Sequence, residues 1–108
     1  MLRFRSLGSG SSGNATVVEA RCGGSVPRLL VDCGFGLRAL ERRLGVAGLG
    51  VGDIDAVFIT HGHGDHIGCA RALALRERIP VWMSHGTWLG QGAPDFDGLL
   101  SAAVNAQP

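Results

Sequence analysis

Glycine is the feature of this sequence that most limits its fold, since eighteen of the 108 residues are glycine. Glycine favours turns and close backbone approaches and weakens helix interiors, so long uninterrupted helices are excluded. The remaining composition, with 45% apolar and 18% charged residues, is typical of one globular domain. A formal net charge of +1 does not by itself favour binding to nucleic acids or to membranes. We therefore expect a small α/β domain built from short elements.

Apolar patterning predicts the order of those elements. Alternating residues over 2–7 and a β-branched run within 14–20 predict two strands that pair as a hairpin across a glycine-rich loop. Three further strands are expected at 28–33, 54–60 and 81–83. The spacing of Leu37, Leu40 and Leu44 predicts an amphipathic helix. A second helix is expected between Gly68 and Pro80, with Ala70, Leu73 and Ala74 facing the core.

The three cysteines, Cys22, Cys33 and Cys69, are odd in number and contain no CxxC pair, which argues against a disulfide framework. We expect all three to be small core residues, although Cys69, one helical turn beyond His66, could instead approach a metal. No apolar run approaches the ~20 residues of a membrane span. The N-terminus also lacks the apolar core of a secretory signal. A cytoplasmic protein without a membrane span is therefore predicted.

A metal site is predicted in the segment that follows the strand at 54–60. Three of the four histidines and one carboxylate fall within residues 61–66. In extended backbone His61 and His63 point to the same side, so two neutral imidazoles can converge on one divalent ion such as Zn²⁺. Asp65 and His66, at the start of the next helix, are offset in direction and can serve a second ion or orient a water. The alternative, a simple turn of glycines and histidines, explains the strand–segment–helix context less well.

These residues carry a resemblance to a known family. His61-Gly62-His63-Gly64-Asp65-His66 resembles the HxHxDH motif of the metallo-β-lactamase-fold hydrolases, with Thr60 as the usual lead-in. Val31-Asp32-Cys33-Gly34 resembles the early strand of that family, which ends in Asp-x-Gly. The segment 7–14 is similar to the opening of the YycJ/WalJ-like bacterial exonuclease branch, and more loosely to that of ribonuclease Z-type phosphodiesterases.

The resemblance implies a fold and a set of roles. The fold is an αββα sandwich, of which residues 1–108 correspond to the N-terminal half, a mixed sheet with flanking helices. Two divalent ions are implied, Zn²⁺ first and Mn²⁺ or Fe as alternatives, with the remaining ligands outside these residues. His61 and His63 would bind one ion, and Asp65 and His66 the other. Asp65 could also act as the general base, while Asp32 and Thr60 would support the metal segment.

The function implied is hydrolysis by a metal-activated hydroxide, with a phosphodiesterase or nuclease acting on DNA or RNA as the first interpretation. A thioester or lactone hydrolase of the same fold is the alternative, because the same nucleophile serves either electrophile. A third interpretation is a catalytically inactive fragment that binds at most one metal weakly. In isolation, these residues are also expected to expose an apolar sheet face and to aggregate.

Overall fold

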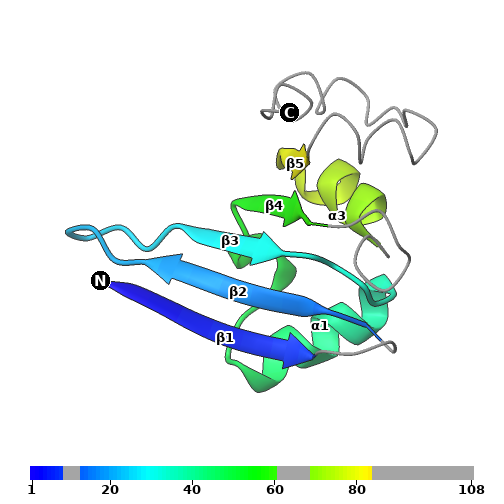
Figure 1. The fold of residues 1–108 in the computed structure, drawn as a ribbon, viewed down its shortest axis with the longest axis horizontal. Helices are drawn as coiled ribbons and strands as arrows, with labels where there is room; N and C mark the ends of the chain where they lie inside the picture. Colours follow the sequence, from blue (N-terminus) through cyan, green and yellow to red (C-terminus); the bar gives the residue numbers. More distant parts are fainter. Residues whose placement is uncertain (9–12, 61–68, 84–108) are drawn as a thin grey trace.

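The computed structural model describes residues 1–8, 13–60 and 69–83, which form a five-stranded sheet and its helices (Figure 1). The strands are β1 (Leu2–Gly8), β2 (Ala15–Ala20), β3 (Arg28–Val31), β4 (Ala56–Ile59) and β5 (Val81–Met83), and they lie in the sheet in sequence order. The helices are α1 (Leu37–Val46), the short 3₁₀ helix η1 (Val51–Asp53) and α3 (Ala70–Glu77). Within these described ranges, no helix has the length and apolar character needed to cross a membrane.

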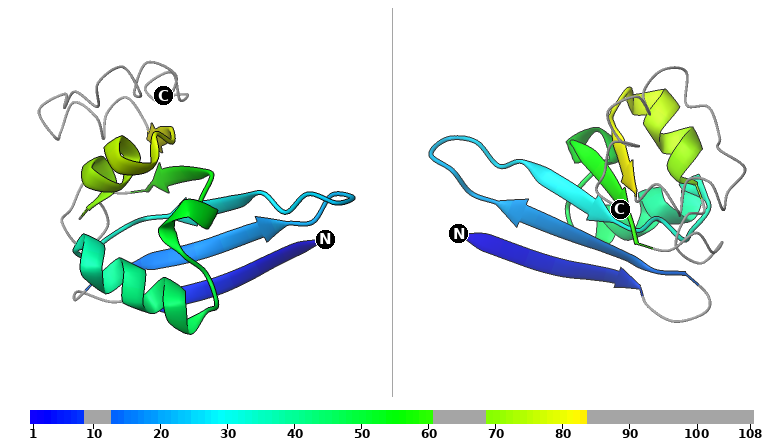
Figure 2. Two further views of the ribbon diagram at one scale, coloured as in Figure 1. Left: turned by 180° about the vertical axis from the view of Figure 1, so that it is seen from behind. Right: turned by 45° about the horizontal axis from the view of Figure 1, so that its top comes forward.

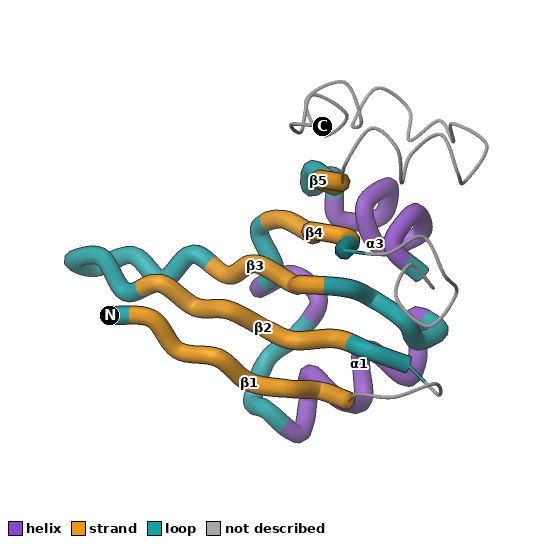
Figure 3. The backbone as a smooth tube through the Cα atoms, viewed as in Figure 1, coloured by secondary structure: helices purple, strands orange, loops and turns teal. Residues whose placement is uncertain are grey.

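The sheet is mixed, as predicted. Strands β1, β2 and β3 form an antiparallel meander, and β3, β4 and β5 run parallel. Figure 3 shows the strands lying side by side in sequence order. Parallel neighbours need a crossover connection, which α1 with η1 supplies between β3 and β4, and α3 between β4 and β5. Strand β3 is shorter than expected because Asp32 adopts a left-handed backbone with φ 64°. Helix α3 ends at Glu77, and its C-cap residue Arg78, two residues before Pro80, is also left-handed.

The core lies between the sheet and its helices, which pack on one face (Figure 2). One row of residues in register, Val17, Leu30, Val57 and Val81, crosses four strands on this face, and each is at most 1% exposed. The helices cover this row with fully buried side chains: Leu40 and Leu44 from α1, and Ala70, Leu73 and Ala74 from α3. The predicted core faces of both helices are therefore confirmed.

The opposite face of the sheet is apolar and only partly covered. Phe58 and Trp82 are register neighbours there and are each 37% exposed, while Phe4 on β1 is 66% exposed. Leu29 and Val31 on β3 are half-buried on the same face. A continuous apolar run such as 29–31 is typical of a strand covered on both faces, but within the described part of the chain Leu29 and Val31 are only half-buried. The helices described here cover only the side on which Leu30 lies.

We expect residues 1–108 in isolation to self-associate through this open face, because contiguous exposed apolar surface marks contact sites. The double variant Phe58→Ser/Trp82→Ser should raise the association midpoint about tenfold or more, which corresponds to ~1.4 kcal/mol. Sedimentation velocity over a concentration series measures this shift. Val46→Ser is the matched control, because Val46 is 91% exposed on α1, on the helical side. Wild-type residues 1–108 that stay monomeric across the series would contradict the prediction.

Candidate functional site

Asp32 holds Thr60 by two hydrogen bonds. Asp32 directly follows β3 and is 6% exposed. Its Oδ1 accepts the backbone N–H of Thr60 at 2.8 Å, and its Oδ2 accepts the Thr60 hydroxyl at 2.7 Å. The backbone N–H of Asp32 donates to the carbonyl of Phe58 at 2.7 Å. One nearly buried carboxylate therefore fixes both the backbone and the side chain of Thr60. Hydrogen bonds to an ionised carboxylate are stronger than those between neutral groups.

The topology explains why these two residues meet. Strands β3 and β4 are parallel neighbours, so their carboxyl ends lie at the same edge of the sheet. Asp32 follows the end of β3, and Thr60 follows the end of β4. In open parallel sheets, this edge is where ligands usually bind. Thr60 directly precedes His61 in the sequence, so Asp32 fixes the point from which the histidine segment starts.

The four predicted metal ligands, His61, His63, Asp65 and His66, lie outside the described residues. Among the residues that are described, no three histidine, cysteine, aspartate or glutamate side chains form a group that could hold a metal ion. The described contacts nevertheless fit such a site. Both oxygens of Asp32 accept hydrogen bonds from Thr60, which suits a residue that orients a ligand-bearing segment rather than one that binds the ion itself.

Two cysteines lie at the same edge. Cys33 directly follows Asp32, and Cys69 is the residue before α3. Both are buried, and their Sγ atoms are 2.9 Å apart. The hydrogen bond between the thiols raises the pKa of Cys33, and burial adds to that rise. The same hydrogen bond lowers the pKa of Cys69, with burial acting in the opposite direction.

The predicted core role is thus confirmed for Cys33 and Cys69, whereas it is wrong for Cys22, which is exposed. Cys22 lies in the turn between β2 and β3, where it forms an isolated bridge with Ser25. Gly23, beside it, has φ 63°, a conformation that glycine adopts without strain. A tight turn of this kind extends beyond the core, so its side chains remain in solvent.

Phe35 packs against both ends of the glycine-rich segment that follows β1. A Cβ atom at Gly13 would lie 2.5 Å from the Phe35 ring, and one at Gly8 would lie 2.6 Å from it. The guanidinium of Arg43 lies over the same ring, 4.2 Å from its centroid, and donates a hydrogen bond to the carbonyl of Leu7. No sequence pattern singled out Phe35. The glycines at 8 and 13 were the available signal, because a close aromatic contact excludes any side chain there.

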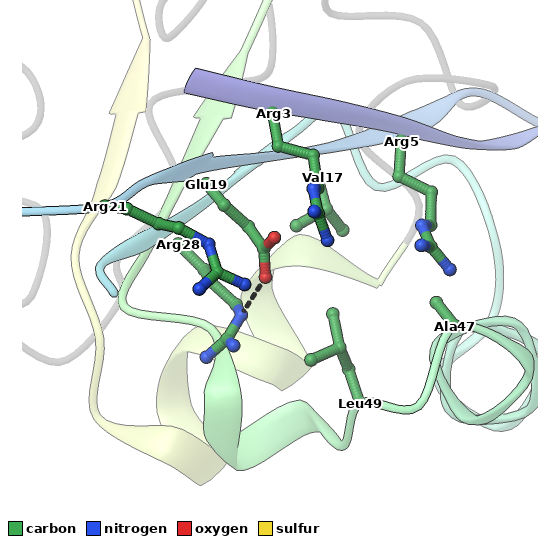
Figure 4. Close-up of a pocket in the computed structure, with 8 residues that line it drawn as sticks. All are labelled: Arg3, Arg5, Val17, Glu19, Arg21, Arg28, Ala47 and Leu49. Atoms are coloured by element: carbon green, nitrogen blue, oxygen red, sulfur yellow. Dashed lines mark hydrogen bonds and ion pairs between the residues drawn. The ribbon is translucent and has the colours of Figure 1, made fainter. Parts of the chain in front are cut away.

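A pocket of about 190 Å³ lies at the other end of the strands (Figure 4). Arg28 donates a hydrogen bond to Glu19 at 2.6 Å inside it. This hydrogen bond lowers the pKa of Glu19 more than any other interaction does. The full lining is Arg3, Arg5, Val17, Glu19, Arg21, Arg28, Ala47 and Leu49. Because Arg28 begins β3 and Asp32 follows the end of β3, the pocket is separated from Thr60 by the length of the strands.

The lowered pKa of Glu19 predicts a pH-dependent effect of Glu19→Gln. A carboxyl whose pKa is lower in the folded state contributes stability above its unfolded pKa and loses it as the pH falls through the folded pKa. The variant should therefore be less stable than wild type at neutral pH. This difference should shrink below the ordinary glutamate value of 4.5. Urea unfolding at several pH values measures it, with Glu41→Gln, whose partner Arg76 is solvent-exposed, as the control. An equal difference at every pH would contradict the assignment.

The chain is similar to a known protein family and to several proteins within it. Residues 8–104 match the family model of the metallo-beta-lactamase superfamily. The exodeoxyribonuclease YycJ of Bacillus anthracis is 37% identical over 87 residues, which cover 81% of this chain and 31% of that protein. The ribonuclease Z of Mycolicibacterium paratuberculosis is 37% identical over 114 residues, covering 98% of this chain and 38% of that protein. The chain thus spans about a third of the length of these relatives.

Two solved structures share the fold of this chain. The Rm3 metallo-beta-lactamase superimposes with a TM-score of 0.59 at 23% identity, over 80% of this chain and 31% of that one. The short form of human tRNase Z has a TM-score of 0.51 at 28% identity, over 78% of this chain and 34% of that one. The five-stranded mixed sheet with helices on one face corresponds to part of each of these structures. The chain belongs to the metallo-beta-lactamase superfamily.

Proposed function

We propose that the protein is a metal-dependent hydrolase that cleaves phosphodiester bonds in DNA or RNA. The observation that carries this proposal is the Asp32 carboxylate, which holds Thr60 at the residue before the HxHxDH segment. The names of the relatives support the substrate class, because exodeoxyribonucleases and ribonucleases Z both act on nucleic acids. Their identity of 34–37% extends over 80–98% of this chain.

The roles proposed for the residues follow their chemistry. His61 and His63 would hold one divalent ion, and Asp65 and His66 a second, with Zn²⁺ as the first candidate and Mn²⁺ or Fe as alternatives. When bound, such ions supply Lewis-acid polarisation and lower the pKa of a water to about 7. Asp65 would accept a proton from the attacking water as a general base. Asp32 and Thr60 orient the segment and take no direct part in the chemistry.

A substrate panel with the full-length protein tests this proposal. End-labelled single-stranded and double-stranded DNA, structured RNA, a thioester and a lactone are incubated with the purified protein, with and without a chelator. We expect release of nucleotides from DNA or RNA, loss of that activity with the chelator, and its recovery with Zn²⁺ or Mn²⁺. Hydrolysis of the thioester or lactone alone would favour the alternative substrates. Nuclease activity that resists the chelator and persists in His63→Ala would refute the metal assignment.

A further inference from the structure

We propose that Cys33 and Cys69 form a reversible disulfide when the protein meets a peroxide. The two side chains come from distant parts of the chain, 36 residues apart, and their sulfur atoms lie 2.9 Å from each other in the core. This observation is independent of the proposed hydrolase activity. It concerns a pair of thiols that the proposed mechanism does not use.

The backbone around the two cysteines already holds them in a suitable position. The N–H of Cys69 donates to the carbonyl of Cys33 at 3.2 Å and to that of Phe35 at 3.1 Å. The carbonyl of Cys69 accepts the N–H of Leu73 at 2.9 Å, which anchors the residue to α3. A disulfide bond is about 2.05 Å long, so the sulfurs need to approach by only about 0.9 Å. Small side-chain rotations supply such a movement without displacing the strands or the helix.

The exposure of the two residues decides which thiol reacts first. Cys33 is fully buried, whereas Cys69 is 9% exposed. Cys69 is also the N-cap residue of α3, where the positive end of the helix dipole favours a thiolate. The exposed cysteine, Cys22, has no sulfur partner within the described part of the chain. Cys69 is therefore the residue that a small oxidant reaches, and Cys33 is the residue that resolves the product.

Hydrogen peroxide is the oxidant in the proposed reaction of the two thiols. The Cys69 thiolate attacks one peroxide oxygen, so a sulfur–oxygen bond forms, the oxygen–oxygen bond breaks, and the departing hydroxide takes a proton to become water. The sulfur of Cys33 then attacks the Cys69 sulfenic acid. A sulfur–sulfur bond forms, the sulfur–oxygen bond breaks, and the second water leaves with the proton of Cys33. Two thiols lose two electrons, and one peroxide is reduced to two waters.

The position of the pair gives the disulfide a specific consequence. Cys33 directly follows Asp32, which holds Thr60, and Cys69 directly follows residues 61–68. The bond would therefore link Cys69, at one end of the segment that carries the predicted ligands, to the neighbour of Asp32, which holds Thr60 at the other end. It would also close a covalent loop over residues 33–69, which restricts the unfolded chain and raises the thermal midpoint of the oxidised protein. A small reductant reverses the change by thiol–disulfide exchange.

Peptide mapping tests the pair directly, because trypsin separates the three cysteines of residues 1–108 into peptides 22–28, 29–38 and 44–71. The full-length protein is treated with hydrogen peroxide, alkylated in denaturant and digested. We expect peptide 29–38 to be linked to peptide 44–71, peptide 22–28 to be alkylated, and the link to disappear with dithiothreitol. Full alkylation of Cys33 and Cys69 after peroxide treatment, or links that involve Cys22, would overturn the proposal.

Variants distinguish a true pair from unspecific oxidation. In Cys33→Ala the reaction should stop at a sulfenic acid on Cys69, which a dimedone probe labels, and peroxide should no longer raise the thermal midpoint. In Cys22→Ser, the control, both the link and the rise in the midpoint should remain. A rise of equal size in Cys33→Ala and wild type would refute the disulfide as its cause. If Cys33→Ala does not fold, the peptide map of the wild-type protein alone decides.

Discussion

Replacing His61 or His63 with alanine should abolish retention of the first metal ion and reduce hydrolytic activity more than ~100-fold. Loss of a residue that merely supports a ligand costs about 10–100-fold in affinity or activity, so loss of a ligand itself should cost more. The two imidazoles are two residues apart, and in extended backbone they would act on the same ion. Elemental analysis of the full-length protein after gel filtration measures the metal content of each variant.

His85→Ala is the matched control for these variants. His85 is the only histidine of the chain outside residues 61–66, and it follows β5 rather than β4. We expect it to retain the metal content of the wild type. Wild-type metal content in both His61→Ala and His63→Ala would contradict the ligand assignment, and so would equal loss in all three variants.

Asp32→Ala should destabilise the protein by about 2–4 kcal/mol and weaken metal binding about 10–100-fold. The substitution removes a charged acceptor from two donors of Thr60. It also places alanine at φ 64°, a left-handed conformation that aspartate adopts more readily than alanine does. Urea unfolding measures the stability, and titration of the metal-free protein with Zn²⁺ measures the affinity.

Two other substitutions separate the proposed role of Asp32 from general damage. Asp55→Ala also removes a carboxylate that accepts a backbone N–H, that of Arg28 at 2.8 Å, but at the opposite end of β4. It should cost less stability and leave metal affinity unchanged. Asp32→Asn keeps the shape and tolerates the left-handed backbone, so it should fold better than Asp32→Ala while still binding metal more weakly. Unchanged affinity in both Asp32 variants would show that this carboxylate does not support the metal segment.

Much of the fold follows from local patterns that the structure confirms. The hairpin of β1 and β2 follows from alternation and a β-branched run, and α1 buries Leu40 and Leu44 as their spacing predicts. The burial of 29–31 could not be predicted in the same way. A continuous apolar run indicates a strand, but it does not show how many faces are covered. Coverage depends on where the helices pack, and in the described part of the chain they lie only on the side of Leu30.

The sequence predicts less of the candidate site than of the fold. The resemblance predicts that Asp32, from Asp-x-Gly, and Thr60, the lead-in of HxHxDH, support the metal segment. The structure shows that these two residues hydrogen-bond to each other, while the metal segment itself lies outside the described residues. The contact between Cys33 and Cys69 was not predictable, because it depends on how α3 packs beside the end of β3. The arginine-lined pocket was missed for a similar reason, since Arg28 meets the residues of β1 and β2 only through strand pairing.

X-ray absorption at the zinc edge of the metal-loaded full-length protein tests the central claim most directly. The account predicts imidazole nitrogen and carboxylate oxygen at about 2.0–2.2 Å, with the multiple scattering typical of histidine rings, and a second metal at ~3.5–4 Å. In the double variant His61→Ala/His63→Ala, the feature of the second metal should disappear and the imidazole scattering should weaken. A sulfur shell at about 2.3 Å, or a spectrum without imidazole scattering, would contradict the claim that residues 61, 63, 65 and 66 hold the metals.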